Sequence, residues 1–168
     1  MANSYDFSRL KVLVVDDSVF MRRVVQTILS ALGVNAVDFA EDGSAALERL
    51  KTFPADVVVC DWDMQPMNGA LFLRRLRMDD KSPNAYVSVI MLTGYTERAR
   101  VEQARELGVT EFLAKPVTPK GIYTRLVAMV ENPRPFVRTR SYFGPCRRRL
   151  EKPDFEGDDR RNEETAHV

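Results

Sequence analysis

The amino-acid sequence predicts an α/β domain with a doubly wound, five-stranded parallel sheet, and two features of the chain predict it. Short runs of consecutive apolar residues, such as Val12-Leu13-Val14-Val15, recur along the chain. Such runs are typical of strands that are buried on both faces of a parallel sheet. Stretches with the apolar spacing of one helix face alternate with these runs, which indicates a (βα)5 order of elements.

The predicted strands are the five apolar segments. Three of them are continuous runs, whereas the segments at 35–39 and 111–113 are weaker. The strands are therefore placed at 12–15, 35–39, 57–60, 89–92 and 111–113.

The predicted helices fill the segments between the strands. The first covers 20–32, where apolar residues from Phe20 to Leu32 share one face and Gly33 ends the helix. The last covers 119–131, with Thr118 as the N-cap and Pro119 in the first helical position. The other three helices are expected at 43–52, 68–77 and 96–107.

The distribution of charge divides the chain after residue 131. The net charge is only +1, but residues 132–150 carry six arginines and no acidic side chain, and residues 151–168 carry seven acidic and three basic side chains. Pro133 and Pro135 also prevent the last helix from continuing. We therefore expect a short lead at 1–8, a globular domain at 9–131 that folds alone, and a mostly irregular tail at 132–168 that is arginine-rich and then acidic.

The composition disfavours several classes of protein. The single histidine, His167, argues against histidine-dependent catalysis, and two cysteines make neither a disulfide framework nor a zinc site. No apolar run approaches the roughly 20 residues of a membrane span. The sequence therefore predicts a cytoplasmic protein without a transmembrane segment. Its tail is too short for a DNA-binding output domain of roughly 60–100 residues, so specific DNA binding is not expected.

Polar side chains follow four of the predicted strands. Asp16 and Asp17 come after the first strand, Asp61 after the third, Thr93 after the fourth and Lys115 after the fifth. In open parallel sheets these ends meet at one edge, where ligands bind. Crowded carboxylates raise each other's pKa unless a cation relieves them, and Mg²⁺ prefers such oxygen ligands. Together with a fixed cation and a hydroxyl group, this arrangement suits phosphoryl transfer to an aspartate.

These residues carry a resemblance to a known family. Residues 9–131 resemble the receiver domain of response regulators, and in particular the stand-alone, CheY-like receivers. The resemblance implies the strand order 2-1-3-4-5 and a phosphorylation-switched signalling protein rather than an enzyme. The motifs that carry it are Val14-Val15-Asp16-Asp17-Ser18, Met21-Arg22-Arg23, Asp61-Trp62-Asp63-Met64-Gln65-Pro66-Met67-Asn68-Gly69, Thr93-Gly94 and Lys115-Pro116.

By this resemblance, Asp61 is the phosphoacceptor, and a sensor histidine kinase, a histidine-phosphotransfer protein or a small phosphodonor supplies the phosphoryl group. Asp16 and Asp17 would hold Mg²⁺ together with Asp61, and the backbone carbonyl of Asp63 would be a further ligand. The output partner is not identified by the sequence.

The resemblance also implies roles for the remaining residues of this edge. Lys115 would stabilise the phosphoryl oxygens, and its peptide bond to Pro116 would be cis. Thr93 would move to bind the phosphoryl group and would be coupled to Phe112, which occupies a position where tyrosine is commoner. Gly94 and Tyr95 would control access to the site.

The tail interleaves aromatic and basic side chains, and its role is left open by the sequence. Its loose resemblance to the arginine-rich tails of CheY-like proteins that bind cyclic di-GMP implies that nucleotide as a ligand, since guanidinium groups bind phosphates and stack on bases. Alternatively, Phe136, Tyr142 and Phe143 dock the tail on its own receiver or on a partner protein, or the arginines bind another polyanion such as RNA or a membrane. The candidate ligand-binding arginines are Arg134, Arg138, Arg140, Arg147, Arg148 and Arg149.

The sequence therefore leaves three functions open. The first is a response regulator whose phosphorylation switches a protein–protein interaction through the surface of the fourth helix, fifth strand and fifth helix. The second is a cyclic di-GMP effector that acts through the tail. The third is a shuttle or phosphate sink in a multistep phosphorelay.

Overall fold

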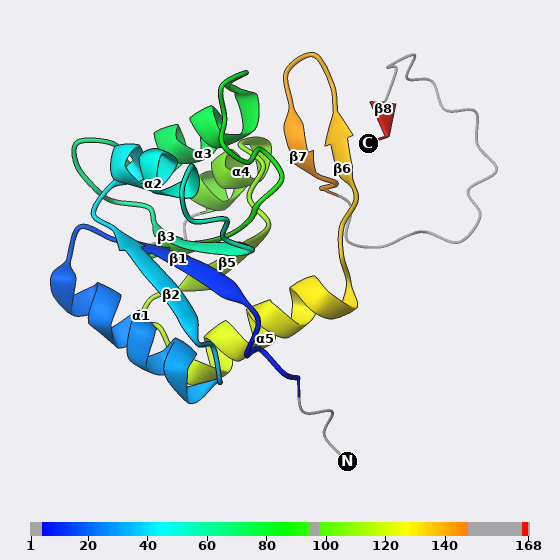
Figure 1. Cartoon of the computed structure of the whole chain (residues 1–168). Coiled ribbons are helices and arrows are strands. Elements are labelled where there is room, and N and C mark those ends of the chain that lie inside the picture. Colours follow the sequence, from blue (N-terminus) through cyan, green and yellow to red (C-terminus); the bar gives the residue numbers. More distant parts are fainter. Residues whose placement is uncertain (1–4, 95–97, 148–165, 168) are drawn as a thin grey trace.

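The computed structural model describes residues 5–94, 98–147 and 166–167 (Figure 1). Within them, five parallel strands form one sheet in the order β2-β1-β3-β4-β5. This order confirms the doubly wound fold and the strand order that the resemblance implied. The strands are β1 (Lys11–Val15), β2 (Ala36–Ala40), β3 (Val57–Asp61), β4 (Ser88–Thr93) and β5 (Glu111–Ala114).

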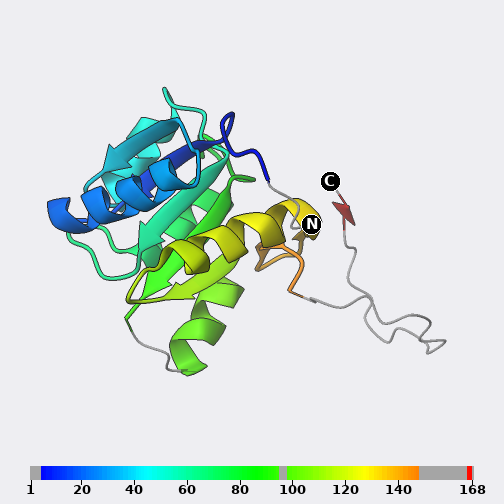
Figure 2. The ribbon, with the colours of Figure 1, turned by 90° about the horizontal axis from the view of Figure 1, so that it is seen from below.

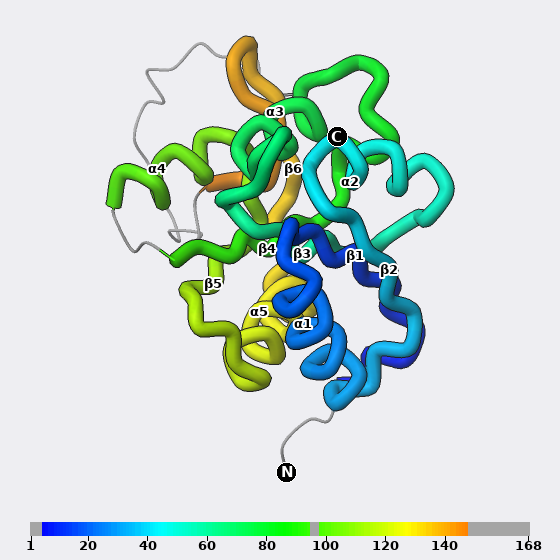
Figure 3. The backbone as a smooth tube through the Cα atoms, turned by 90° about the vertical axis from the view of Figure 1, so that its left-hand side faces the viewer, coloured from blue at the N-terminus to red at the C-terminus, as the bar shows by residue number. Residues whose placement is uncertain are grey.

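Two layers of helices cover the sheet. One face carries α1 and α5, and the other carries α2, α3 and α4 (Figures 2 and 3). Successive residues of β1 point to opposite cores: Val14 packs on the side of α1 and α5, and Val15 on the side of α2 and α3. The helices are α1 (Val19–Ala31), α2 (Gly43–Leu50), α3 (Gly69–Met78), α4 (Arg98–Glu106) and α5 (Pro119–Glu131).

Four of these helices begin with a polar side chain that caps the first turn. Ser18, Asp42, Asn68 and Thr118 each accept a hydrogen bond from the backbone N–H three residues later. The predicted cap at Thr118 is thus confirmed. Because each cap follows a strand of the parallel sheet, the caps place the first turns of these helices around the edge where the predicted site lies.

The ends of the predicted helices differ slightly from the observed ones. The helix predicted at 43–52 ends at Leu50, and the N–H groups of Thr52 and Phe53 then turn onto the carbonyl of Arg49. The helix predicted at 96–107 begins at Arg98 in the described part of the chain. None of the helices in the described ranges is both long and apolar enough to cross a membrane.

The tail contains a short hairpin that the sequence pattern did not predict. Strands β6 (Phe136–Arg138) and β7 (Phe143–Pro145) pair antiparallel, and the two-residue strand β8 (Ala166–His167) pairs with β6. The β6–β7 hairpin lies beside α3 and α4 (Figure 1). Strands of three residues carry too little alternation for a period of two to be recognised.

Candidate functional site

The carboxyl edge of the sheet brings three carboxylates together. Strands β1 and β3 are neighbours, so their ends place Asp16, Asp17 and Asp61 with oxygen atoms within 4.8 Å of one another. Asp16 and Asp61 are 2% and 4% exposed, whereas Asp17 is exposed to solvent. Like charges this close repel, and the repulsion favours a bound cation.

Asp16 supplies the observation that best tests the fit of a metal. Its Oδ1 accepts a hydrogen bond from the backbone N–H of Ser18 at 2.8 Å, but its buried Oδ2 has no hydrogen-bond partner in the structure. Burial raises the pKa of Asp16, and the nearby charge of Asp61 raises it further. A buried carboxylate oxygen without a donor, next to two further carboxylates, is a fitting ligand set for a hard divalent cation such as Mg²⁺.

Lys115 places a fixed cation on the same cluster. Its Nζ lies 2.8 Å from Oδ1 of Asp61. Burial lowers the pKa of Lys115, but the hydrogen bond to Asp61 and the charges of Asp61 and Asp16 outweigh burial and raise it overall. The peptide bond to Pro116 is cis, as the resemblance implied.

Thr93 ends β4 next to the cluster. In the pairing of β3 with β4, Asp61 is opposite Leu92, so Thr93 extends one residue past the acidic cluster, where it is buried. The backbone N–H of Lys115 donates to the carbonyl of Thr93 at 2.8 Å and holds the ends of β4 and β5 together. Thr93 and Lys115 are thus brought to the same edge as Asp61.

Of the two residues expected to control access to the site, the structure describes Gly94. Gly94 is exposed, and a Cβ added to it would meet no heavy atom of the described residues within 4 Å. Tyr95 lies outside the described residues. Phe112 lies on β5, partly buried against the core beneath α2, α3 and α4, and its carbonyl accepts a hydrogen bond from Arg125 Nε.

Two arginines at this edge were missed from the sequence. Nη1 of Arg100 on α4 lies 3.2 and 3.4 Å from the carboxylate oxygens of Asp63. Nη1 of Arg22 on α1 donates to the backbone carbonyl of Asp16 at 2.5 Å. A charged residue on a predicted helix face is usually solvated, so the pattern carried no signal for either contact.

The tail arginines that the structure describes do not join this edge. Because α3 and α4 start near the carboxyl ends of the strands, the hairpin beside their last turns lies at the opposite end of the sheet. Arg134 donates to the carbonyl of Cys146, and the guanidinium groups of Arg138 and Arg147 stack on the rings of Phe143 and Tyr142. Arg140 is exposed, while Arg148 and Arg149 are outside the described residues.

A comparison of the sequence with known protein families identifies the family of this chain. Residues 12–127 match the family described as response regulator receiver domain. The chain belongs to the response regulator receiver family. Receiver domains are signalling modules of two-component systems and bind Mg²⁺ at an acidic pocket. In this receiver the described residues include one such acidic cluster, made of Asp16, Asp17 and Asp61.

This receiver is similar to several chemotaxis proteins. It is 35% identical over 122 residues to the chemotaxis protein CheY-3 of Vibrio cholerae, which covers 73% of this chain and 92% of that protein. It is 36% identical over 118 residues to CheY1 of Helicobacter pylori, which covers 70% and 94%.

Two solved structures show the same fold. The chemotaxis response regulator CheY4 of Vibrio cholerae matches with a TM-score of 0.63 and 31% identity, over 70% of this chain and 96% of that one. The CheX–CheY–BeF3–Mg²⁺ complex from Borrelia burgdorferi matches with a TM-score of 0.64 and 27% identity, over 72% and 89%. The receiver therefore accounts for about 70% of the chain, and the tail lies beyond the similar region.

The buried charge of Asp16 yields a first prediction. Asp16→Asn is expected to raise the free energy of unfolding by about 1 kcal/mol at neutral pH without Mg²⁺, because it removes a poorly solvated buried charge. Saturating Mg²⁺ at 100 times its Kd is expected to stabilise the wild type by about 2.7 kcal/mol and the variant much less. Urea unfolding of both proteins, with and without MgCl₂, measures these differences.

The pH dependence gives the sign of the same effect. The folded-state pKa of Asp16 is raised above its ordinary value of 3.8, so the folded protein binds more protons than the unfolded chain between these two pKa values. Stability should therefore fall as the pH rises through this window, and Asp16→Asn should remove that contribution. Asp80→Asn, at an exposed position, is the matched control. Equal Mg²⁺ stabilisation of wild type and Asp16→Asn would remove Asp16 from the metal site.

Proposed function

We propose that this protein is a two-component response regulator in which Asp61 accepts a phosphoryl group and thereby switches a protein–protein interaction. The observation that carries this proposal is the ion pair between Lys115 and Asp61, at 2.8 Å, beside two further carboxylates at the open edge of the sheet. This arrangement presents one carboxylate as a nucleophile between a fixed cation and a metal ligand set.

The chain's own residues perform most of the reaction. A carboxylate oxygen of Asp61 attacks the phosphorus of the donor, a bond from that oxygen to phosphorus forms, and the bond to the donor's nitrogen or oxygen breaks with its electron pair leaving on the donor. Lys115 neutralises charge on the phosphoryl oxygens, and Thr93 donates its hydroxyl hydrogen to one of them. When bound by Asp16, Asp17, Asp61 and the carbonyl of Asp63, Mg²⁺ supplies further neutralisation of that charge.

The partners follow from this chemistry. A sensor histidine kinase or a histidine-phosphotransfer protein would supply the phosphoryl group, and Thr93 and Phe112 would transmit its presence to the surface formed by α4, β5 and α5. A shuttle or phosphate-sink role uses the same chemistry and stays a prediction. The cyclic di-GMP hypothesis also stays a prediction. Three of the described tail arginines already contact groups of the tail itself, and a nucleotide would compete with these contacts.

Phosphorylation by a small donor tests the proposal directly. The wild-type protein, incubated with acetyl phosphate and MgCl₂, is expected to gain the mass of one phosphoryl group, and borohydride reduction followed by peptide mass spectrometry should locate it at Asp61. Omitting Mg²⁺ with EDTA present should suppress the reaction. Modification at any other residue, or none with a donor that phosphorylates a control receiver, would contradict the assignment.

A further inference from the structure

The β6–β7 hairpin is packed into the receiver rather than appended to it. Phe143 is 1% exposed, and its ring meets the ring of Tyr86, from the loop before β4, edge-on at 5.0 Å. The centre of the Phe136 ring lies 5.1 Å from the centre of the Tyr86 ring and 5.5 Å from that of Phe143, so the three rings form one cluster. Such aromatic pairs stabilise beyond the area that they bury. The structure thus agrees with the docking alternative for the tail.

Arg77 joins the hairpin to two parts of the receiver. This side chain of α3 is 2% exposed, and its Nε donates to the carbonyl of Gly108 at 2.9 Å while Nη1 donates to the carbonyl of Ala85 at 2.7 Å. Its guanidinium lies 5.1 Å from the centre of the Phe136 ring. The hairpin therefore covers the group that holds α3 against the turn between α4 and β5.

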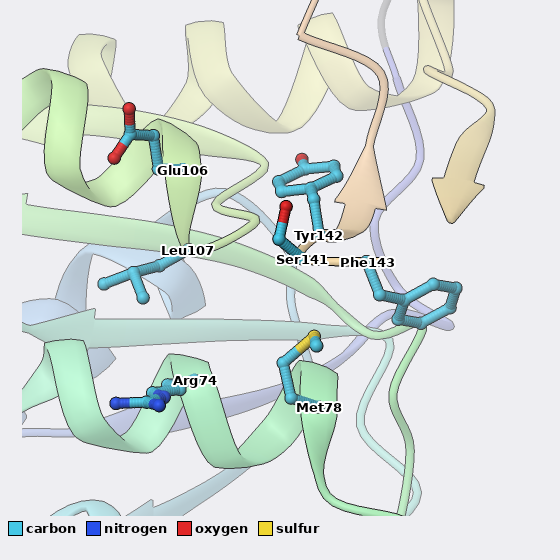
Figure 4. A pocket seen from close by; sticks show the side chains of 7 residues that line it. All are labelled: Arg74, Met78, Glu106, Leu107, Ser141, Tyr142 and Phe143. Carbon is cyan, nitrogen blue, oxygen red and sulfur yellow. The ribbon is translucent and has the colours of Figure 1, made fainter. Parts of the chain in front are cut away.

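The hairpin also contacts the turn that follows α4. Its backbone approaches Gly108 so closely that a Cβ added there would lie 2.8 Å from the carbonyl oxygen of Phe143. A pocket beside this contact is lined by Glu106, the last residue of α4, by Leu107, which follows it, and by Tyr142 and Phe143 from the hairpin (Figure 4). The turn that continues α4 is therefore packed against the hairpin, so a shift of this turn acts on the hairpin.

The other half of α4 is attached to the phosphorylation site. Arg100 pairs with Asp63, which follows the proposed phosphoacceptor by two residues. Between these two attachments, α4 has little hold on the core, because Ala104 is the one residue of its nine that is buried. An element with few buried contacts moves at low cost in free energy.

From these contacts we infer that docking of the β6–β7 hairpin and occupancy of the Asp61 site are energetically coupled through α4, with Arg100 as the positioning residue of the link. This inference rests on the proposed function of Asp61. A phosphoryl group carries about two negative charges and draws the Arg100 guanidinium away from Asp63. The movement of α4 that follows weakens the contact of the hairpin with Gly108.

The coupling must act in both directions. If occupancy of the site weakens docking of the hairpin, then loss of docking must strengthen binding at the site by the same factor. Phosphorylation thereby releases the hairpin from the receiver. Conversely, a partner that binds the released hairpin favours the phosphorylated receiver.

Two measurements on the full-length protein test this coupling. In both, beryllofluoride with Mg²⁺ takes the place of the phosphoryl group on Asp61. Hydrogen exchange of residues 136–146 in the wild type is expected to accelerate at least about fivefold when the site is saturated. Binding is followed by the fluorescence of Trp62, the single tryptophan of the chain, which directly follows Asp61. Phe143→Ala is expected to bind beryllofluoride at least about fivefold more tightly than the wild type.

Two further variants separate the coupling from general loosening of the structure. Ser141→Ala changes an exposed side chain in the turn of the same hairpin, keeps the backbone hydrogen bond to Thr139, and should bind like the wild type. In the background of Arg100→Ala, Phe143→Ala should no longer change the affinity, because the link to the site is cut.

The outcomes are distinguishable. Unchanged exchange of residues 136–146 at saturation, in a wild type that binds beryllofluoride, would overturn the coupling and leave the proposed function intact. Absence of any Trp62 response, confirmed by calorimetry, would overturn the proposed function and the coupling with it. The exchange measurement needs no variant, so it decides the question even if Phe143→Ala does not fold.

Discussion

Asp61→Asn is expected to abolish formation of the acyl phosphate. The amide lacks an anionic oxygen to attack phosphorus, and Asp61 is the carboxylate that Lys115 contacts. Removing the nucleophile from a preorganised site costs on the order of 10⁴-fold or more in rate. Intact-mass measurement after incubation with acetyl phosphate and MgCl₂ should therefore detect no adduct on this variant.

The same variant should remain folded, which distinguishes lost chemistry from lost structure. Replacing Asp61 removes one charge from a crowded cluster, so the pKa of Asp16 should fall and the pKa of Lys115 should fall with the loss of its ion pair. An NMR pH titration of both side chains measures these shifts. Phosphorylation of Asp61→Asn at the native rate would show that the phosphoacceptor is another residue.

Arg77→Leu is expected to destabilise the protein by about 3 kcal/mol. The substitution leaves the buried carbonyl of Gly108 and the half-buried carbonyl of Ala85 without their donor, and hydrogen bonds to a charged group contribute about 1.5–3 kcal/mol each. It also removes the stacking on Phe136. Part of this loss is offset, because burial lowers the pKa of Arg77 to about 9 and the charge is costly to bury even though it stays protonated at neutral pH.

Urea unfolding measures this loss. Arg75→Leu, at an exposed position of the same helix, is the matched control and should change stability by no more than about 0.5 kcal/mol. The loss of stability for Arg77→Lys should fall between those of the two leucine variants. An ammonium group lacks the fixed fork of donors with which the guanidinium binds both carbonyls. Hydrogen exchange should increase most at residues 136–146. Equal midpoints for Arg77→Leu and Arg75→Leu would show that the buried arginine does not hold the hairpin.

The fold and most of the acidic site are visible in the sequence because each depends on residues that are near one another along the chain. An apolar run such as 57–60 identifies a buried strand, and the next residue, Asp61, lies at its carboxyl end. The topology then gathers Asp16, Asp17 and Lys115 at the same edge without any further information. Local caps such as Thr118 are predictable for the same reason.

The tertiary structure alone decided how the tail and α4 are held. Arg77 and Gly108 are 31 residues apart, and Arg100 and Asp63 are 37 apart, so no local pattern relates the partners. An arginine on a helix face reads as solvated until the chain folds a carbonyl or a carboxylate onto it.

The sequence by itself determined the receiver fold and the acidic edge, because strand burial and strand ends are properties of short segments. Only the tertiary structure decided that Phe143 is buried and Phe136 half-buried in one ring cluster on the receiver, because burial of the hairpin depends on a surface that α3, the loop before β4 and the turn after α4 form together. Arg77 is buried for the same reason: its two carbonyl partners and the covering ring of Phe136 meet only when those distant segments pack.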